Sequence, residues 1–145
     1  MLGGGGAMKE LFGRHAATVP PERVLAILTD PESLRRMAGP GHTVDVVGPG
    51  VYATEVIIGP AAIGQRFPLE ITVDAAPGMI NLRATGQGRA VGMWLEAACA
   101  LQPSPGGSLL QYSVRYEPGP LRLAMWSPRS VGRWVKDWLS ALDLN

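Results

Sequence analysis

The sequence has very little cysteine and histidine, and each scarcity excludes a kind of site. Cys99 is the one cysteine among 145 residues, so an internal disulfide and a thiolate metal cluster are excluded. It lies in an apolar run, which predicts a buried, inert thiol. The two histidines are His15 and His42, and His42 falls in a predicted turn. We therefore expect no metal site.

The chain also lacks an excess of charge of either sign. Thirteen basic and 12 acidic residues leave a net charge of +1. Without a basic or acidic run, electrostatics favours neither nucleic acid nor an anionic membrane as a partner. No apolar run approaches the roughly 20 residues of a membrane span, and nothing resembles a signal peptide. We expect a soluble cytoplasmic protein without a membrane span.

A phosphate-binding or dinucleotide-binding loop is lacking as well. Gly86-Gln87-Gly88 with Gly92 departs from the dinucleotide fingerprint, because the third glycine is one position late and no helix follows. No cofactor is therefore expected. The first residues are mostly glycine and have nothing to bury, so residues 1–8 are predicted to be disordered, and Met8 is an alternative start. Residues 9–145 have the length of a single domain.

The N-terminal part predicts one strand and two short helices. Alternation over residues 9–19 predicts a strand that turns His15 inward, whereas the opposite phase would turn Phe12 inward. We favour the first phase because Val19 leads into the next buried element. Two proline-containing helix starts follow, at Pro20-Pro21-Glu22 and Asp30-Pro31-Glu32. The second helix is expected to reach about Met37.

The middle of the chain changes from helical spacing to alternation with a period of two. Glycine and proline turns separate six predicted strands, around residues 44–46, 51–58, 67–73, 80–84, 93–101 and 110–116. Apolar residues alternate with polar ones, which indicates an antiparallel sheet with one wet face. A twisted sheet of about seven such strands curls, so its dry face becomes concave.

The C-terminal part predicts an amphipathic helix that covers the dry face. Ser127 suits the N-cap and Pro128 the first helical position. Apolar residues recur at spacings of three and four, at Val131, Trp134, Val135, Trp138, Leu139 and Leu142. The predicted class is α+β.

Several segments resemble the carbon monoxide dehydrogenase G-type subunit family of the START-like (SRPBCC) superfamily. They are Val24 to Leu34, Gly59-Pro60-Ala61-Ala62-Ile63-Gly64, Gly86-Gln87-Gly88, and Gly106-Gly107-Ser108 before Leu110-Gln111-Tyr112. The similarity extends from Lys9 to Leu142. It implies a helix-grip (START/Bet v 1-like) fold with an apolar cavity between sheet and helix. It also implies lipid binding or association with a molybdenum hydroxylase, and it supplies no catalytic residues.

The chain departs from this family at Pro128. Family members usually continue one helix from about the position of Leu121, whereas a proline breaks or kinks it. Residues 121–126 are then expected to form a separate short segment over the cavity mouth. The chain also stops at Asn145, without the long tail of some relatives.

The leading functional hypothesis is non-catalytic binding of an apolar or amphipathic small molecule, such as a lipid, a quinone or a polyketide-like ring system. The candidate ligand-binding residues share the predicted dry face: His15, Phe67, Leu69, Leu82, Met93, Leu95, Tyr112, Tyr116, Trp134 and Trp138. The histidine and the two tyrosines would orient the polar end of the ligand. The alternative is that these side chains simply fill the core.

Two other classes of function stay open. A small polyketide cyclase or dehydratase would use His15 with a tyrosine as its acid and base. An accessory protein would dock on a larger enzyme through exposed apolar residues before the helix, namely Leu123, Met125 and Trp126.

Overall fold

The computed structural model describes residues 9–38, 43–58, 65–87, 94–117 and 128–144. It begins with strand β1 (Lys9–Ala17) and helices α1 (Pro21–Leu28) and α2 (Pro31–Ala38). Six strands follow: β2 (Val44–Gly48), β3 (Val51–Ile58), β4 (Gln65–Ala76), β5 (Met79–Gly86), β6 (Trp94–Ser104) and β7 (Gly107–Glu117). Helix α3 (Pro128–Leu139) and the 3₁₀ turn η3 (Ser140–Leu144) end the described chain.

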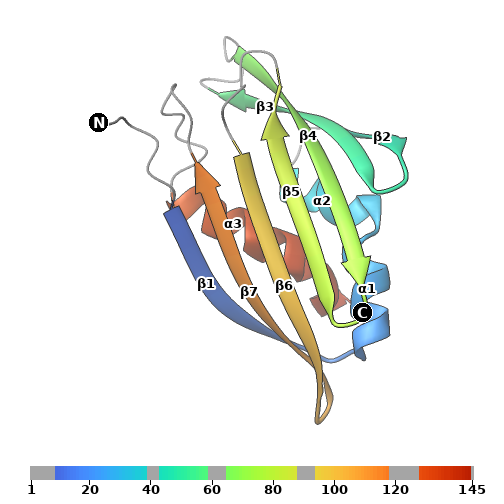
Figure 1. Ribbon diagram of the computed structural model, residues 1–145. Coiled ribbons are helices and arrows are strands. Elements are labelled where there is room, and N and C mark those ends of the chain that lie inside the picture. The colour runs from blue at the N-terminus through green and yellow to red at the C-terminus, as the bar shows by residue number, and fades with distance from the viewer. Residues whose placement is uncertain (1–8, 39–42, 59–64, 88–93, 118–127, 145) are drawn as a thin grey trace.

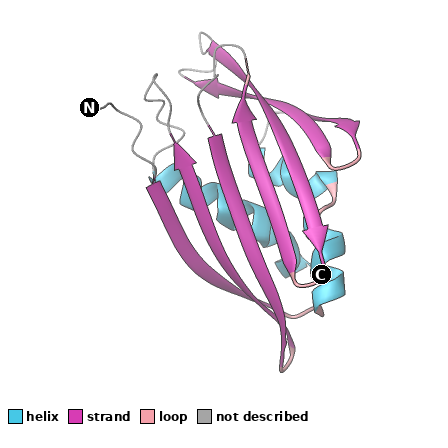
Figure 2. Cartoon of the chain, in the orientation of Figure 1, coloured by secondary structure: helices cyan, strands magenta, loops and turns pink. Residues whose placement is uncertain are grey.

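The seven strands form one antiparallel sheet in the order β1-β7-β6-β5-β4-β3-β2. Strand β1 therefore lies beside β7, although most of the chain separates them. Helix α3 crosses one face of the curved sheet, and α2 packs against α3 (Figures 1 and 2). The face toward α3 is called the inner face below, and the opposite one the outer face.

The predicted phase of the first strand is confirmed. Phe12 is 74% exposed on the outer face, whereas Ala17 is buried and His15 partly buried. Val46 differs from the simple alternation, because it is 61% exposed although Val44 is buried. The register of β2 shifts after Val46, and β2 is the last strand of the sheet. Val46 still pairs directly with Tyr52, so it keeps the face of Val44, and its exposure reflects its place on the edge strand.

The predicted helix starts at Pro31 and Pro128 are confirmed. The Asp30 carboxylate accepts the backbone N–H of Glu32 at 2.9 Å, as a capping residue should. Ser127, the predicted N-cap of α3, and residues 121–126 lie outside the described residues. The exposed side of α3 carries Arg133, as its sequence pattern predicts.

The C-terminal stripe does not continue as one α-helix to Leu142. The α-helix ends at Leu139, and Leu142 belongs to η3, where it is fully buried. The Ser140 hydroxyl donates to the Asp137 carbonyl at 2.6 Å, a local bond that competes with regular helical pairing.

The end of α1 joins the helices to the sheet. The Leu28 carbonyl accepts the indole N–H of Trp138 and the hydroxyl of Ser33, each at 3.2 Å. The neighbouring Thr29 carbonyl accepts the Tyr52 hydroxyl of β3 at 3.3 Å. The last carbonyls of a helix have no partner within the helix, so these side chains satisfy groups that would otherwise be unpaired.

The turn between β6 and β7 packs tightly against the end of β1. Gly107 has a φ of 153°, and a Cβ there would lie 2.1 Å from the Ala17 carbonyl oxygen. The buried Ser108 hydroxyl donates to the Val19 carbonyl at 2.6 Å. A side chain at position 107 would push the two segments apart, so this position requires glycine.

Candidate functional site

The inner face of the sheet is apolar where α3 covers it. One row of directly paired residues crosses five strands: Tyr116, Leu95, Ala84, Ile71 and Tyr52. All five side chains are buried, and so are Leu69 and Leu82 from the predicted set. The inward positions described for β5, β6 and β7 carry no charged side chain. A ligand against this part of the sheet would meet carbon almost everywhere.

Tyr116 is the polar exception in this row. Its side chain is fully buried, and its hydroxyl has no hydrogen-bond partner among the described residues. Burial raises the pKa of Tyr116 above its ordinary value, so the phenol stays neutral near neutral pH. Buried polar atoms are nearly always hydrogen-bonded in folded proteins. The unpaired phenol is therefore the one side chain of this row that calls for a polar partner.

Trp138 serves mainly as a structural anchor. Its ring is 1% exposed, and its N–H is committed to the Leu28 carbonyl at 3.2 Å. The indole thus ties α3 to the end of α1. Trp134, one turn earlier on α3, is partly buried and packs against the core. Of the two indoles, Trp134 is the better placed to change environment when a ligand binds.

The side chain of Tyr112, on β7, lies over Gly13 of the neighbouring strand β1. It pairs with Gly13 of β1, and a Cβ at Gly13 would be 2.3 Å from the Tyr112 ring and hydroxyl. The ring therefore occupies the space that a side chain at position 13 would need, an arrangement that compensates for a glycine within a strand. Tyr112 is partly buried in this position.

His15 lies near η3, far from Tyr116. Its Nε2 is 3.3 Å from the Asp143 carboxylate, without a hydrogen bond of good geometry. His15 pairs with Leu110, six positions before Tyr116 on β7, which corresponds to about 20 Å along a strand. From the sequence we expected His15 and Tyr116 to contact the same polar end of a ligand. The structure instead places them far apart along the sheet.

Two of the predicted site residues lack a described side chain. Phe67 lies in β4 opposite Val56, and the structure describes its backbone alone. Met93, together with His42, lies outside the described residues. Leu95, two residues after Met93 in the sequence, is buried as predicted.

Cys99 is fully buried on β6, which confirms its prediction. Burial raises the pKa of the Cys99 thiol to about 12. The neutral thiol is a poor nucleophile and a poor metal ligand. Within the described ranges, no three His, Cys, Asp or Glu side chains cluster as a metal site would require. No described helix is long and apolar enough to cross a membrane.

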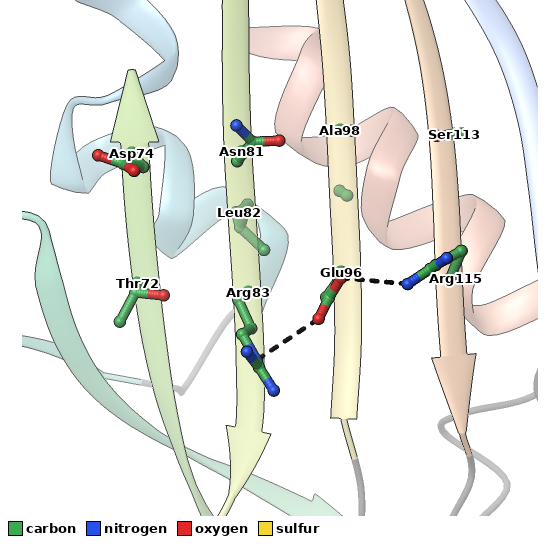
Figure 3. A pocket seen from close by; sticks show the side chains of 10 residues that line it. Thr72, Asp74, Asn81, Leu82, Arg83, Glu96, Ala98, Ser113 and Arg115 are labelled. Carbon is green, nitrogen blue, oxygen red and sulfur yellow. Dashed lines mark ion pairs between the residues drawn. The ribbon is translucent and has the colours of Figure 1, made fainter. Parts of the chain in front are cut away.

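The outer face carries a shallow groove of about 540 Å³ across β4 to β7. At one side of it, Glu96 lies between two arginines, 3.7 Å from Arg83 and 3.6 Å from Arg115 (Figure 3). All three side chains are exposed by 39% or more, so water screens these ion pairs. Sequence alternation placed these residues on the wet face, but the cross-strand register was needed to align them.

A second depression, of about 390 Å³, lies where α1, α2 and η3 meet. Its charged lining has both signs, with Arg23 and Arg36 beside Asp30 and Glu32. Ser33 at its floor already donates to the Leu28 and Asp30 carbonyls. No buried polar group there is left without a partner in the described part of the chain.

Comparison with known proteins supports the architecture. No protein-family model matches the chain, and no curated protein matches its sequence. Solved structures do match. The protein Mll3558 from Rhizobium loti aligns with a TM-score of 0.67 at 18% identity, over 97% of this chain and 99% of that one.

Two further matches identify the architecture. Ara h 8.0201 aligns with a TM-score of 0.65 at 17% identity, over 94% of this chain and 96% of that chain. A norcoclaurine synthase from Thalictrum flavum, solved with a transition-state analogue, aligns with a TM-score of 0.62 at 12% identity, over 98% of each chain. This is the helix-grip fold. At these identities the similarity establishes the Bet v 1-like fold alone.

Proposed function

We propose that the protein binds a neutral, largely apolar small molecule between the inner face of the sheet and α3. The observation that carries the proposal is the buried Tyr116 hydroxyl, which has no partner among the described residues. A carbonyl or hydroxyl oxygen of a ligand would satisfy it. Lipids, quinones and polyketide-like ring systems combine such an oxygen with a large carbon surface.

The charge distribution favours a neutral ligand over an anionic one. The described inward positions of β5 to β7 offer no cation to a carboxylate or phosphate. A buried charge without a partner is unfavourable by several kcal/mol, whereas buried carbon contributes about 25 cal/mol per Å². We therefore expect a quinone or an alcohol to bind in preference to a fatty acid of similar size.

If the ligand occupies a chamber between the sheet and α3, cavity energetics predicts that this chamber is filled. An empty apolar volume of ~300 Å³ would cost about 7 kcal/mol at 24 cal/mol per Å³. A domain of this size has only about 5–15 kcal/mol of net stability. An apolar chamber of that size would therefore be retained only if water or a ligand fills it.

The test uses a naphthoquinone, a long-chain alcohol and a fatty acid as probes, with tryptophan fluorescence and calorimetry as readouts. We expect the quinone or the alcohol to bind and to change the Trp134 signal. Tyr116→Phe should weaken binding of that probe about three- to tenfold, the effect of one hydrogen bond. Tyr52→Phe is the matched control, because the Tyr52 hydroxyl is already bonded to Thr29.

Two outcomes would contradict this function. The first is that none of the neutral probes binds, together with no small molecule retained in native mass spectrometry of protein from its own host. The second is binding that Tyr116→Phe leaves unchanged, which would move the ligand away from this hydroxyl.

A role beside a partner enzyme rests on the sequence resemblance to the carbon monoxide dehydrogenase G-type subunit family. On that basis we propose a molybdenum hydroxylase as the partner to test. Affinity capture from the native host, followed by metal analysis, should recover molybdenum with the protein. Capture that contains no molybdenum would remove this proposal and leave small-molecule binding untouched.

The His15–Asp143 pair favours an acid–base enzyme as the second candidate. A carboxylate 3.3 Å from an imidazole is close enough to orient the ring. Norcoclaurine synthase, with the same fold, is an enzyme by name. If this candidate is right, His15→Ala should abolish turnover of a cyclisation or dehydration substrate and Asp143→Asn should reduce it. Equal turnover in all three proteins would exclude it.

A further inference from the structure

The outer edge of β1 is open for strand pairing. Strand β1 is the first in the sheet order, and no described element pairs with its far side (Figure 1). All nine residues pair with β7 in one unbroken register. At the opposite edge, β2 has five residues and a register shift. A long regular edge without a bulge or proline is a template for another strand.

An exposed aromatic ring stands at the middle of this edge strand. Phe12 lies on the outer face and is 74% exposed, the largest exposed fraction among the exposed large hydrophobic residues of the described chain. Glu10 and Arg14 lie two positions before and after it on the same face, and both are exposed. Along the outer face of β1, an acidic, an aromatic and a basic side chain therefore follow one another: Glu10, Phe12 and Arg14.

This order is self-complementary in an antiparallel pair. When two copies of β1 pair with Phe12 opposite Phe12, each Glu10 lies opposite the Arg14 of the second copy. Opposite charges directly across a strand pair stabilise it, and so do paired aromatic rings. A register centred on Gly13 would set Phe12 against Arg14, and one centred on Leu11 would set Glu10 against Phe12. Only the Phe12-centred register matches both charge and ring.

The inner face accepts the same register. Leu11 would lie opposite the Gly13 of the second copy, where the Tyr112 ring already covers the glycine. Lys9 would lie opposite His15, whose neighbour at 3.3 Å is the Asp143 carboxylate. No two carboxylates face one another across the pair.

We infer that β1 is the interface of a symmetric dimer of this chain, centred on Phe12, in which the two sheets join into one. Such a dimer does not depend on the proposed ligand. A single strand pair buries little surface, so the dimer is expected to be weak, in the micromolar range. Concentration-dependent association is then its signature.

Sedimentation velocity of the full chain, at concentrations up to near-millimolar, tests the interface. The native protein should shift from monomer to dimer. Arg14→Glu should weaken association about tenfold or more, because it places two carboxylates opposite each other at both ends of the pair. Arg14 pairs with the neutral Gln111 within its own sheet, so this change leaves the monomer intact. Arg23→Glu on α1 is the matched charge-reversal control and should dimerise normally.

A mixing experiment separates the interface from effects on folding. Glu10→Arg alone should also weaken association about tenfold or more, since it places like charges across the pair. An equimolar mixture of the Glu10→Arg and Arg14→Glu proteins should associate, because every facing pair is again of opposite sign. Since Glu10 also faces Arg115 in its own sheet, circular dichroism must first show that Glu10→Arg folds.

Where Glu10→Arg does not fold, Phe12→Gln provides the second variant. It should weaken association at least tenfold while circular dichroism stays native. Slower amide hydrogen exchange of β1 at high concentration should accompany dimer formation and disappear in Phe12→Gln. A native protein that stays monomeric near millimolar concentration overturns the inference. A dimer whose dissociation constant is the same in the native protein, Arg14→Glu and Phe12→Gln overturns it as well.

Discussion

The two faces of the sheet are built from the same strands but carry opposite kinds of interaction. On β6, Leu95 is 4% exposed and faces α3, while the next side chain, Glu96, is 39% exposed and faces water. On β7, the buried Tyr116 follows the exposed Arg115. Neighbouring residues on a strand thus lie on opposite faces: one side chain is buried among apolar groups, and the next is charged and exposed to water.

The difference between the faces shows where polar groups matter energetically. On the outer face Glu96 has two arginine partners, and water could replace both of them (Figure 3). On the inner face the Tyr116 hydroxyl has no described partner, and it is shielded from solvent. A missing partner is costly only where water is excluded. This contrast supports the proposal that a ligand binds on the inner face, which shows less polar chemistry.

The largest expected contrast comes from truncating one aromatic ring on each face. Trp138→Ala should lower the free energy of unfolding by about 3–5 kcal/mol, because it leaves a cavity and removes the indole hydrogen bond to the Leu28 carbonyl. Phe12→Ala on the outer face should change it by less than about 0.5 kcal/mol in dilute solution. Urea denaturation at low protein concentration measures both. Similar losses from the two variants would contradict the assignment of the faces.

The next largest effect should come from the alkaline pH dependence of Cys99. Its thiol pKa rises from 9.0 to about 12 on burial, so the folded state keeps the proton that the unfolded state releases. The contribution to stability is complete below about pH 9 and is lost as the pH rises toward 12. The total amounts to about 4 kcal/mol at 1.36 kcal/mol per pKa unit.

Cys99→Ala isolates this contribution, since it removes the thiol and leaves the tyrosines in place. The difference in unfolding free energy between the native protein and Cys99→Ala should shrink steadily between pH 9 and pH 12. A constant difference over this range would mean that the thiol is not shielded. Slow alkylation of native Cys99 at neutral pH should accompany the result.

A smaller effect of opposite sign distinguishes two buried tyrosines in the same row. Without ligand, Tyr116→Phe should raise the free energy of unfolding by about 1 kcal/mol, because it removes an unpaired buried hydroxyl. Tyr52→Phe should lower it by a similar amount, since it removes the bond to the Thr29 carbonyl. Thermal unfolding of ligand-free protein measures both. A loss in both variants would show that water already satisfies Tyr116.

The smallest effect should come from the charged row of the outer face. Glu96→Gln should reduce stability by less than about 1 kcal/mol, and added salt should reduce that loss further. Glu70→Gln, on the same face and without an ion pair in the described structure, is the control. A salt-independent loss of several kcal/mol would mean that the outer groove is less wet than its exposure indicates.

Much of the fold could be predicted from local patterns. Pro31 after Asp30 marked the start of α2, and the alternation around Phe12 gave the correct face of β1. The pattern did not predict the exposure of Val46, which keeps the face of Val44 but lies on the edge strand. It also failed at Leu142, where the last turn tightens into a 3₁₀ conformation. The first difference lies at the edge of the sheet and the second at the end of the last helix, where an element has fewer neighbours than in its interior.

The candidate site was less predictable, because its key relations join distant parts of the chain. Tyr116 and Trp138 were both expected to line the site, but their polar atoms have different roles. The Trp138 N–H reaches the Leu28 carbonyl, 110 residues away, while the Tyr116 hydroxyl reaches no described group. His15 on β1 pairs with Leu110, six positions before Tyr116 on β7, so the two side chains lie far apart. Neither fact follows from which residue type stands at which position.

The sequence by itself determined the order of the elements and the face on which each side chain lies, because periods of 3.6 and two residues are local properties of the backbone. The tertiary structure alone decided which buried polar group finds a partner and which strand is left at an edge. Those outcomes depend on how strands and helices far apart in the chain come together. Among the described residues, they leave the Tyr116 hydroxyl without a hydrogen-bond partner on the inner face and one edge of β1 without a neighbouring strand, the two features on which the proposals rest.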